Sequence, residues 1–221
     1  HLSTRRQRQM CIRDSTNHRP KPLLPICGVT LLDHARAHLA AHSIDRILVN
    51  AHHLWQQIAA WTEQNDAALQ VELPDILGTG GGLRAALPRL ADTVVVFNGD
   101  ILCDVDLTAL VAACPADGAV MATRAVEELG GINPVVADAH GVVLRIGDIT
   151  AAPGAPPLCK TGPGTHFTGI HAMSRVTIEA VPADGFACVV RTAYRDLVPQ
   201  RRITAVPHPG TWVDAGTPRR Y

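Results

Sequence analysis

The stretch from residue 93 to residue 106 constrains the fold more than any other part of the chain. It opens with Thr-Val-Val-Val-Phe and then ends abruptly in Asn98, Gly99 and Asp100. An unbroken run of β-branched and aromatic residues predicts a buried central strand. Such a strand would deliver the Asp100 carboxylate to the carboxyl edge of a sheet, where open α/β sheets bind their ligands.

Asp100 allows two interpretations on this stretch alone. A carboxylate at the mouth of an apolar strand is costly unless water, a hydrogen-bond donor or a cation compensates it. Mg2+ prefers such oxygen ligands and binds one or two carboxylates together with substrate phosphates. Asn-Gly-Asp clusters also cap turns. The first interpretation predicts a metal ligand, and the second predicts a turn residue.

Strands and helices alternate along most of the chain. The segments 132–137 and 142–146 flank an Asp-Ala-His-Gly turn and predict an antiparallel hairpin. Together these elements predict an α/β fold with a mostly parallel sheet flanked by helices, built as one domain over 17–221. The expected helices are 31–42, 54–64, 107–113, 175–180 and 189–197, and the other expected strands are 44–49, 69–73, 118–123, 166–173 and 203–206.

The composition excludes several classes of function. The 20 Lys and Arg residues balance the 20 Asp and Glu residues, so we expect no nucleic-acid partner, which would need a basic face. No apolar run approaches the roughly 20 residues that span a bilayer, so we expect a soluble protein without a membrane partner. The six cysteines form no C-x-x-C pair. This pattern indicates reduced thiols and a cytoplasmic location.

Histidines give a weaker metal signal than the carboxylates. His52 adjoins His53, and His166 lies near His171. Neither pair has a third ligand at a spacing that a histidine metal site would use. We therefore expect no histidine metal centre.

Lys21 lies in a segment that cannot be helical. Residues 19–26 hold three prolines around this single lysine, which predicts an extended and conformationally restricted chain. Such rigidity would fix an ammonium group that suits a phosphate as a point charge. The alternative interpretation is a surface linker with an exposed lysine.

A glycine-rich segment follows the expected strand at 69–73. Gly78 and residues 80–82 are glycines between this strand and a helical stretch at 85–87. Glycines let the backbone approach a ligand closely and turn N–H groups toward it. The segment matches neither G-x-G-x-x-G nor G-x-x-x-x-G-K-[ST], so neither of those nucleotide-binding loops is present. A plain turn is the alternative interpretation.

Two further features lie late in the chain. Thr168 and Gly169 fall inside an expected strand, where a glycine marks a bulge or a ligand-facing edge. Asp214 is a second isolated carboxylate that directly follows an apolar pair. It therefore repeats the pattern that ends in Asp100.

Taken together, these motifs resemble the sugar-1-phosphate nucleotidylyltransferases. This family has a Rossmann-like, GT-A-like α/β fold, a three-layer sandwich, and joins a sugar phosphate to a nucleotide. The motifs occur in the family's order and span the chain from about residue 17 onward. The resembling segments are 19–26, 77–83, 96–100, 167–171 and 212–217.

The resemblance implies a displacement at the α-phosphate of a nucleoside triphosphate by a sugar-1-phosphate oxygen, with pyrophosphate leaving. Lys21 matches the lysine that steadies the phosphates, and Asp100 and Asp214 match the pair that holds Mg2+. The glycine-rich segment matches the backbone that accommodates the base, and residues 168–169 lie where the family contacts the sugar. The implied substrate-binding residues are Gly78, Thr79, Gly80, Gly81, Asn98, Thr168 and Gly169.

Residues 1–16 depart from the family pattern. They carry four arginines and no apolar period, where the family has a first strand and a G-x-G-T-R turn that grips phosphate. We interpret them as an anomalous, disordered lead-in to an N-terminally truncated domain. Loss of these phosphate donors predicts family activity for the intact parent and a crippled product for this chain.

Two other functions fit parts of the sequence. Asp104 and Asp106 form a D-x-D pattern that can bind a metal-diphosphate in GT-A glycosyltransferases. A non-catalytic subunit that binds sugar nucleotides would share the fold and lose the front turn, but it would have no need of Lys21, Asp100 and Asp214. The sequence leaves open whether GTP or UTP reacts, with which sugar 1-phosphate, and how subunits associate.

Overall fold

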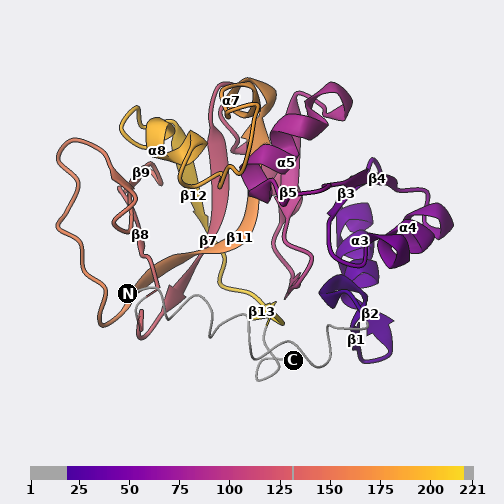
Figure 1. Cartoon of the computed structure of the whole chain (residues 1–221). Coiled ribbons are helices and arrows are strands. Elements are labelled where there is room, and N and C mark those ends of the chain that lie inside the picture. Colours follow the sequence, from indigo (N-terminus) through magenta and orange to yellow (C-terminus); the bar gives the residue numbers. More distant parts are fainter. Residues whose placement is uncertain (1–18, 131, 217–221) are drawn as a thin grey trace. The chain divides into compact units, whose positions relative to one another are not determined.

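The computed structural model describes residues 19–130 and 132–216, which form two compact units (Figure 1). The described part of the first unit comprises residues 19–75, 98–104 and 211–216. The second unit comprises residues 76–97 and 105–210. Residues 1–16, interpreted above as a lead-in, lie outside the described residues. The expectation of one domain over 17–221 stays a prediction.

The first unit is built from short strands and two helices. The connection from β3 through α4 to β4 is a parallel crossover, so both strands end at the same edge. Leu32, Ala51, Ile58 and Trp61 form its small core. The elements are η1 (Lys21–Leu23), β1 (Pro25–Ile26), β2 (Val29–Thr30), α3 (Leu31–Ala41), β3 (Leu48–Ala51), α4 (Trp55–Gln64), β4 (Ala68–Val71), β6 (Ile101–Cys103) and β13 (Trp212–Asp214).

Polar contacts fix how α3 begins and how α4 packs on it. The Thr30 hydroxyl oxygen accepts a hydrogen bond from the Asp33 N–H at 3.1 Å, which caps the first turn. The Trp61 indole donates to the Asp33 carboxylate at 2.8 Å. Burial raises the pKa of Asp33, but the hydrogen bonds that the Thr30 hydroxyl and the Trp61 indole donate to its carboxylate hold that pKa below its usual value. The Asp33 carboxylate therefore links the beginning of α3 to Trp61 on α4.

The second unit contains a four-stranded sheet in the order β12-β7-β11-β5. Strands β5, β7 and β12 run in one direction and β11 runs against them, which confirms the expected mostly parallel sheet of an α/β fold. Its elements are α5 (Gly78–Ala86), η2 (Leu87–Arg89), β5 (Thr93–Phe97), α6 (Leu107–Ala112), β7 (Ala119–Val126), β8 (Val135–Ala137), β9 (Val143–Ile146), β10 (Thr150–Ala151), β11 (Gly164–Ser174), α7 (Arg175–Glu179), α8 (Ala193–Leu197) and β12 (Ile203–Pro207).

The core of the second unit surrounds β7 and β11. Met121 and Met173 are inaccessible to solvent, and Tyr194 and Ile203 cover them from α8 and β12. The expected hairpin is present, because β8 pairs antiparallel with β9.

The prediction that residues 93–97 form a buried central strand was wrong. Among the described strands, β5 lies at the end of the sheet order, and its residues 94–97 are only half-buried.

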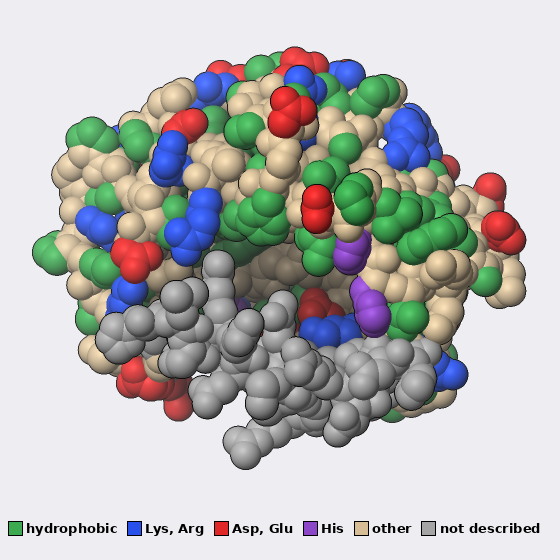
Figure 2. All heavy atoms as spheres, in the orientation of Figure 1, with side chains coloured by type: hydrophobic (Ala, Val, Ile, Leu, Met, Phe, Trp, Pro, Cys, Tyr) green, Lys and Arg blue, Asp and Glu red, His purple; other side chains and the backbone are tan. Residues whose placement is uncertain are grey.

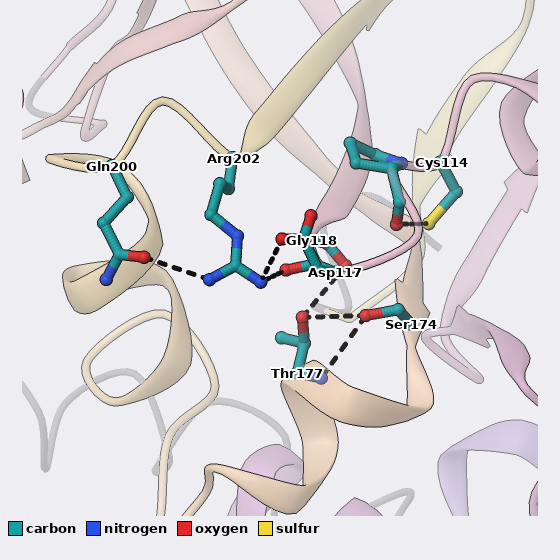
Figure 3. A network of polar contacts seen from close by, with 8 residues as sticks. Cys114, Asp117, Gly118, Ser174, Thr177, Gln200 and Arg202 are labelled. Atoms are coloured by element: carbon teal, nitrogen blue, oxygen red, sulfur yellow. Dashed lines mark hydrogen bonds and ion pairs between the residues drawn. The ribbon is translucent and has the colours of Figure 1, made fainter.

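A polar network ties the beginnings of β7, β12 and α7 together (Figure 3). The Arg202 guanidinium forms an ion pair with the Asp117 carboxylate at 3.0 Å and also donates to the Asp117 carbonyl. The Thr177 hydroxyl donates to the Gly118 carbonyl at 3.1 Å. Gly118 has no space for a side chain, since a Cβ there would lie 2.1 Å from the Arg202 carbonyl oxygen. This end of the sheet is therefore tightly joined.

The surface carries both charges. Figure 2 shows Lys and Arg side chains interspersed with Asp and Glu side chains over the visible face, as the equal numbers in the sequence predict. Within the described part of the chain, every helix is too short or too polar to cross a bilayer.

Candidate functional site

Strand pairing in the first unit brings two distant aspartates together. Asp214 on β13 pairs with Ile101 on β6, and Ile101 directly follows Asp100. The Ala215 N–H also donates to the Asp100 carbonyl at 2.9 Å. The two predicted metal ligands therefore lie one register step apart across an antiparallel pair.

Both carboxylates face the same point beside Gly216. A Cβ at Gly216 would lie 2.7 Å from Asp214 Oδ1 and 2.8 Å from Asp100 Oδ2. The Gly216 N–H donates to Asp214 Oδ1 at 2.8 Å, which orients that carboxylate. Glycine is required at this position because any side chain would fill the space between the two acids.

The electrostatics at Asp100 favour a cation. Burial and the nearby Asp214 charge raise the pKa of Asp100, while the Lys21 ammonium opposes this effect. Two carboxylates that repel each other form an oxygen donor set suited to Mg2+, which would offset the repulsion. No group of three or more His, Cys, Asp or Glu side chains in the described chain could hold a metal. The remaining ligands of a metal here would therefore be phosphates and water.

Lys21 joins this pair from the proline-rich segment. Its Nζ donates to the Gly216 carbonyl at 3.1 Å. The neighbouring Pro22 packs on Gly99, where a Cβ would lie 3.1 Å from the proline ring. The rigid segment thus holds Lys21 beside the aspartates, and the three predicted catalytic residues occur together in one compact unit.

Asp100 also belongs to a turn, so the two interpretations offered by the sequence are compatible. The Ile101 N–H donates to the Asn98 carbonyl at 3.1 Å, which closes a turn through Gly99 and Asp100. The turn aims the Asp100 side chain at Gly216. Asn98 itself is exposed at the start of the turn, and its role in substrate binding stays a prediction.

The D-x-D carboxylates have other surroundings. Asp106 caps α6, because its Oδ1 accepts from the Ala109 N–H at 2.9 Å. The Asp104 N–H donates to the Thr211 carbonyl at 3.2 Å, which continues the β6–β13 pairing. The structural role of Asp106 removes the main support for a glycosyltransferase.

The glycine-rich segment is helical, whereas the sequence predicted a turn before the helix. Helix α5 begins at Gly78 although glycine is a poor helix former. Residues 185–189 pack directly on its first turn, and a Cβ at Gly80 would lie 3.0 Å from the Ala187 carbonyl oxygen. The glycines are therefore needed for close packing between two chain segments.

Backbone hydrogen bonds hold this contact from both sides. The N–H groups of Gly80 and Gly81 donate to the Ala187 carbonyl at 2.8 and 3.2 Å, and the Ala187 N–H donates to the Leu77 carbonyl at 2.8 Å. Two of the N–H groups that we expected to face a ligand are thus engaged within the protein. Thr79 is exposed and Gly78 is half-buried.

Thr168 and Gly169 form a bulge in β11. The pairing with β7 shifts register between Phe167 and His171, and Gly169 has a φ of 88°. The Thr168 side chain is 2% exposed; its hydroxyl donates to the Ala122 carbonyl at 2.9 Å and accepts from the Ile170 N–H at 3.2 Å. The hydroxyl is therefore structural, and the predicted contact with a sugar would fall to the backbone of the bulge.

The two histidines of β11 are buried and lie within hydrogen-bonding distance of neighbouring protein groups. His171 Nδ1 lies 2.5 Å from the Tyr194 hydroxyl, and both side chains are fully buried. Burial lowers the pKa of His171 to about 3 and raises the pKa of Tyr194. His166 Nδ1 lies 2.9 Å from the Phe167 carbonyl oxygen. The imidazole of His171 is therefore neutral at ordinary pH.

The sequence missed a polar cluster where β3 and β4 end. The Asn50 amide donates to the Glu72 carboxylate at 2.7 Å, and the Gln70 amide donates to Asn50 Oδ1 at 3.2 Å. His52 Nδ1 lies 2.7 Å from the Glu72 carbonyl oxygen. Polar residues clustered after two apolar strands were the available signal, but their pairing depends on the parallel register.

Comparisons with known proteins identify the family of the chain. A family model described as a MobA-like NTP transferase domain matches residues 13–196. The N-acetylmuramate alpha-1-phosphate uridylyltransferase of Neisseria meningitidis is 27% identical over 215 residues, which cover 93% of this chain and 88% of that protein. The UTP–glucose-1-phosphate uridylyltransferase of Synechocystis is 27% identical over 193 residues. There the match covers 78% of this chain and 48% of that protein, so the chain spans about half of its length.

The fold is also found among solved structures. The crystal structure of HddC from Yersinia pseudotuberculosis complexed with GMP-PN has a TM-score of 0.72 and 21% identity. The structural match covers 91% of this chain and 87% of the HddC chain. The comparisons confirm the predicted nucleotidyltransferase family and the α/β fold class.

Proposed function

Because the chain belongs to the MobA-like NTP transferase family, we propose that it transfers a nucleotidyl group from GTP or UTP to a sugar 1-phosphate. The products are a nucleoside-diphosphate sugar and pyrophosphate. The observation that carries the proposal is the convergence of Asp100 and Asp214 beside Gly216, with Lys21 bound to the same glycine. The Neisseria and Synechocystis relatives are named as uridylyltransferases of N-acetylmuramate 1-phosphate and glucose 1-phosphate, which supports a sugar 1-phosphate as the acceptor.

The reaction asks little covalent chemistry of the protein. An oxygen of the sugar phosphate forms a bond to the α-phosphorus, and the bond from that phosphorus to the bridging oxygen breaks, so pyrophosphate leaves with the electron pair. The attacking oxygen is already anionic, so no general base is needed. The contribution of the chain is to align the phosphates and to neutralise their charge.

Three side chains divide this task. Asp100 and Asp214 hold Mg2+, which supplies positive charge to the phosphates when bound. Lys21 adds a fixed point charge from the proline-rich segment. The Asp100 carboxylate must be deprotonated to act, and the ammonium of Lys21 favours that state.

The proposal also covers the identity of the nucleotide and the cellular compartment of the protein. The family resemblance assigns residues 78–81 to the nucleotide base, residues 168–169 to the sugar, and Asn98 to substrate binding. In the glycine-rich segment, Thr79 is exposed and Gly78 is half-buried, so these two residues are the ones accessible to a base. Uridylyltransferase relatives support UTP, and the guanine nucleotide complex of HddC supports GTP. None of the five described cysteines forms a disulfide within the described chain, which supports the cytoplasm as the compartment.

A pyrophosphate-release assay tests the proposal. The purified chain is incubated with Mg2+, with GTP or UTP, and with glucose, mannose, heptose or N-acetylmuramate 1-phosphate. A second protein carries a strand and a G-x-G-T-R turn ahead of residue 17. We expect slow turnover by the chain itself and faster turnover by the extended protein. Absence of turnover by both proteins, with every pair of substrates, would contradict the proposal.

A further inference from the structure

Phe186 is the most exposed large hydrophobic residue of the described chain, with 70% of its surface accessible. Single apolar residues on a protein surface are ordinary and need no explanation by themselves. Phe186 differs because backbone hydrogen bonds hold the residue that follows it, Ala187. It lies between Gly185 and Ala187, in the segment that packs on the first turn of α5.

The position of the ring follows from this packing. The Ala187 hydrogen bonds to Leu77, Gly80 and Gly81 fix the residue that follows Phe186. A Cβ at Gly78 would lie 2.8 Å from Cε2 and 3.1 Å from Cζ of the phenyl ring. The ring therefore rests against Gly78, which has no side chain, while most of the surface of Phe186 stays open to solvent.

We propose that Phe186 is the aromatic platform on which the base of the nucleoside triphosphate stacks. This inference rests on the proposed function and assigns a residue that the motifs do not contain. An aromatic face gains roughly 1–3 kcal/mol from stacking on a base, and any base can supply the second π-face. Phe186 thus contributes affinity for the nucleotide without selecting between guanine and uracil.

The chemistry of the ring distinguishes the base from the other substrate groups. Phosphates are hydrated anions that gain nothing from an apolar surface. A planar, weakly polar ligand loses unfavourable hydration against a phenyl ring. Because the Ala187 hydrogen bonds already fix the backbone next to Phe186, little conformational entropy is lost when a ligand binds to the ring.

Equilibrium binding tests this inference independently of turnover. Isothermal titration calorimetry compares GTP, UTP and inorganic tripolyphosphate, which has no base, on the unmodified chain and on Phe186→Ala. We expect about a tenfold weaker Kd for both nucleotides and an unchanged Kd for tripolyphosphate. Phe186→Trp keeps an aromatic face and restores nucleotide affinity, whereas Phe186→Leu does not. Val176→Ala, which truncates a 55% exposed residue on α7, is the matched control and changes nothing.

Other outcomes overturn specific claims. An unchanged nucleotide Kd in Phe186→Ala, or an equal loss for tripolyphosphate, would show that the ring does not stack on the base. Sedimentation velocity tests the alternative that a second copy of the chain covers the Phe186 ring. A dimer that Phe186→Ala dissociates without changing nucleotide affinity would make the ring a subunit contact. Failure of both the unmodified chain and the extended protein to bind either nucleotide would overturn the proposed function itself.

Discussion

Asp100 and Asp214 each direct one carboxylate oxygen toward the same point beside Gly216, where a Cβ would lie 2.8 Å from the first and 2.7 Å from the second. Burial and the nearby Asp214 charge raise the pKa of Asp100, so a bound cation would stabilise the two carboxylates in their charged form. The mutational predictions below follow from this arrangement and from the packing of α5.

Removing either charge should stop turnover and leave the fold intact. In the extended protein, Asp100→Asn and Asp214→Asn should each lower kcat at least about a hundredfold, because each loses an anionic ligand of the metal. Steady-state kinetics with varied Mg2+ measure this, and circular dichroism checks the fold. Asp104→Ala is the control and should retain the normal rate. A near-normal rate in either asparagine variant would refute the assignment.

Loss of the Lys21 ammonium should lower the rate of nucleotidyl transfer, because this charge is held beside the two aspartates. Lys21→Ala should lower kcat about a hundredfold, since it removes a fixed charge from the reacting phosphates. Lys160 offers a matched control because its ammonium pairs with exposed Asp148 at 2.9 Å. Lys160→Ala should leave kcat unchanged. Equal effects of the two substitutions would mean that Lys21 is a surface lysine in a linker, as the alternative interpretation holds.

Substitution of Gly216 should reduce activity as strongly as substitution of Asp100 or Asp214. In Gly216→Ala the new methyl group enters the space between the two carboxylates, so we expect metal affinity and kcat to fall, the latter about a hundredfold. Mn2+ titration followed by electron paramagnetic resonance reports the metal affinity directly. Gly154→Ala is the control for backbone strain, because a Cβ there meets no atom within 4 Å but the φ of 77° disfavours alanine, and it should leave Mn2+ affinity unchanged. Unchanged Mn2+ affinity in Gly216→Ala would contradict the convergence of the carboxylates.

Gly80→Ala should destabilise the protein although it improves helix propensity. Alanine in a helix interior ordinarily gains about 1 kcal/mol over glycine. Here the Cβ would lie 3.0 Å from the Ala187 carbonyl and 3.1 Å from the Val189 nitrogen, and such overpacking costs about 1–3 kcal/mol. Urea unfolding measures the net change. An increase in the free energy of unfolding would show that residues 185–189 move aside easily.

The buried His171 predicts a dependence of stability on pH. Its pKa falls from 6.5 to about 3 on folding, so between these values the unfolded state binds the proton that the folded state excludes. The free energy of unfolding should therefore fall as pH falls below 6.5, by at most roughly 1.4 kcal/mol per pH unit from this group. His171→Gln should have a shallower slope in urea titrations from pH 7 to pH 4. Equal slopes would contradict a buried neutral imidazole.

The extent of sequence prediction can be judged at particular residues. The apolar run at 93–97 identified a strand and the break at Asn98 identified its end, because β-branched runs and turn residues act locally. The three prolines around Lys21 predicted an extended segment that cannot be helical, and this prediction was wrong, because Lys21–Leu23 forms a 3-10 helix whose first turn accommodates a proline. The sequence placed the beginning of α5 too late, since glycine propensity disfavours a helix that tertiary packing stabilises.

By itself, the sequence determined the alternation of strands and helices, the hairpin, and the carboxylates that follow apolar runs. Only the tertiary structure decided which carboxylates meet: β6 pairs with β13, so Asp214 reaches Asp100, while Asp106 caps a helix. It also revealed why Gly216 and Gly80 lack side chains. Local propensities act over a few residues, whereas a site built from residues 21, 100, 214 and 216 depends on register and packing between segments far apart in the chain.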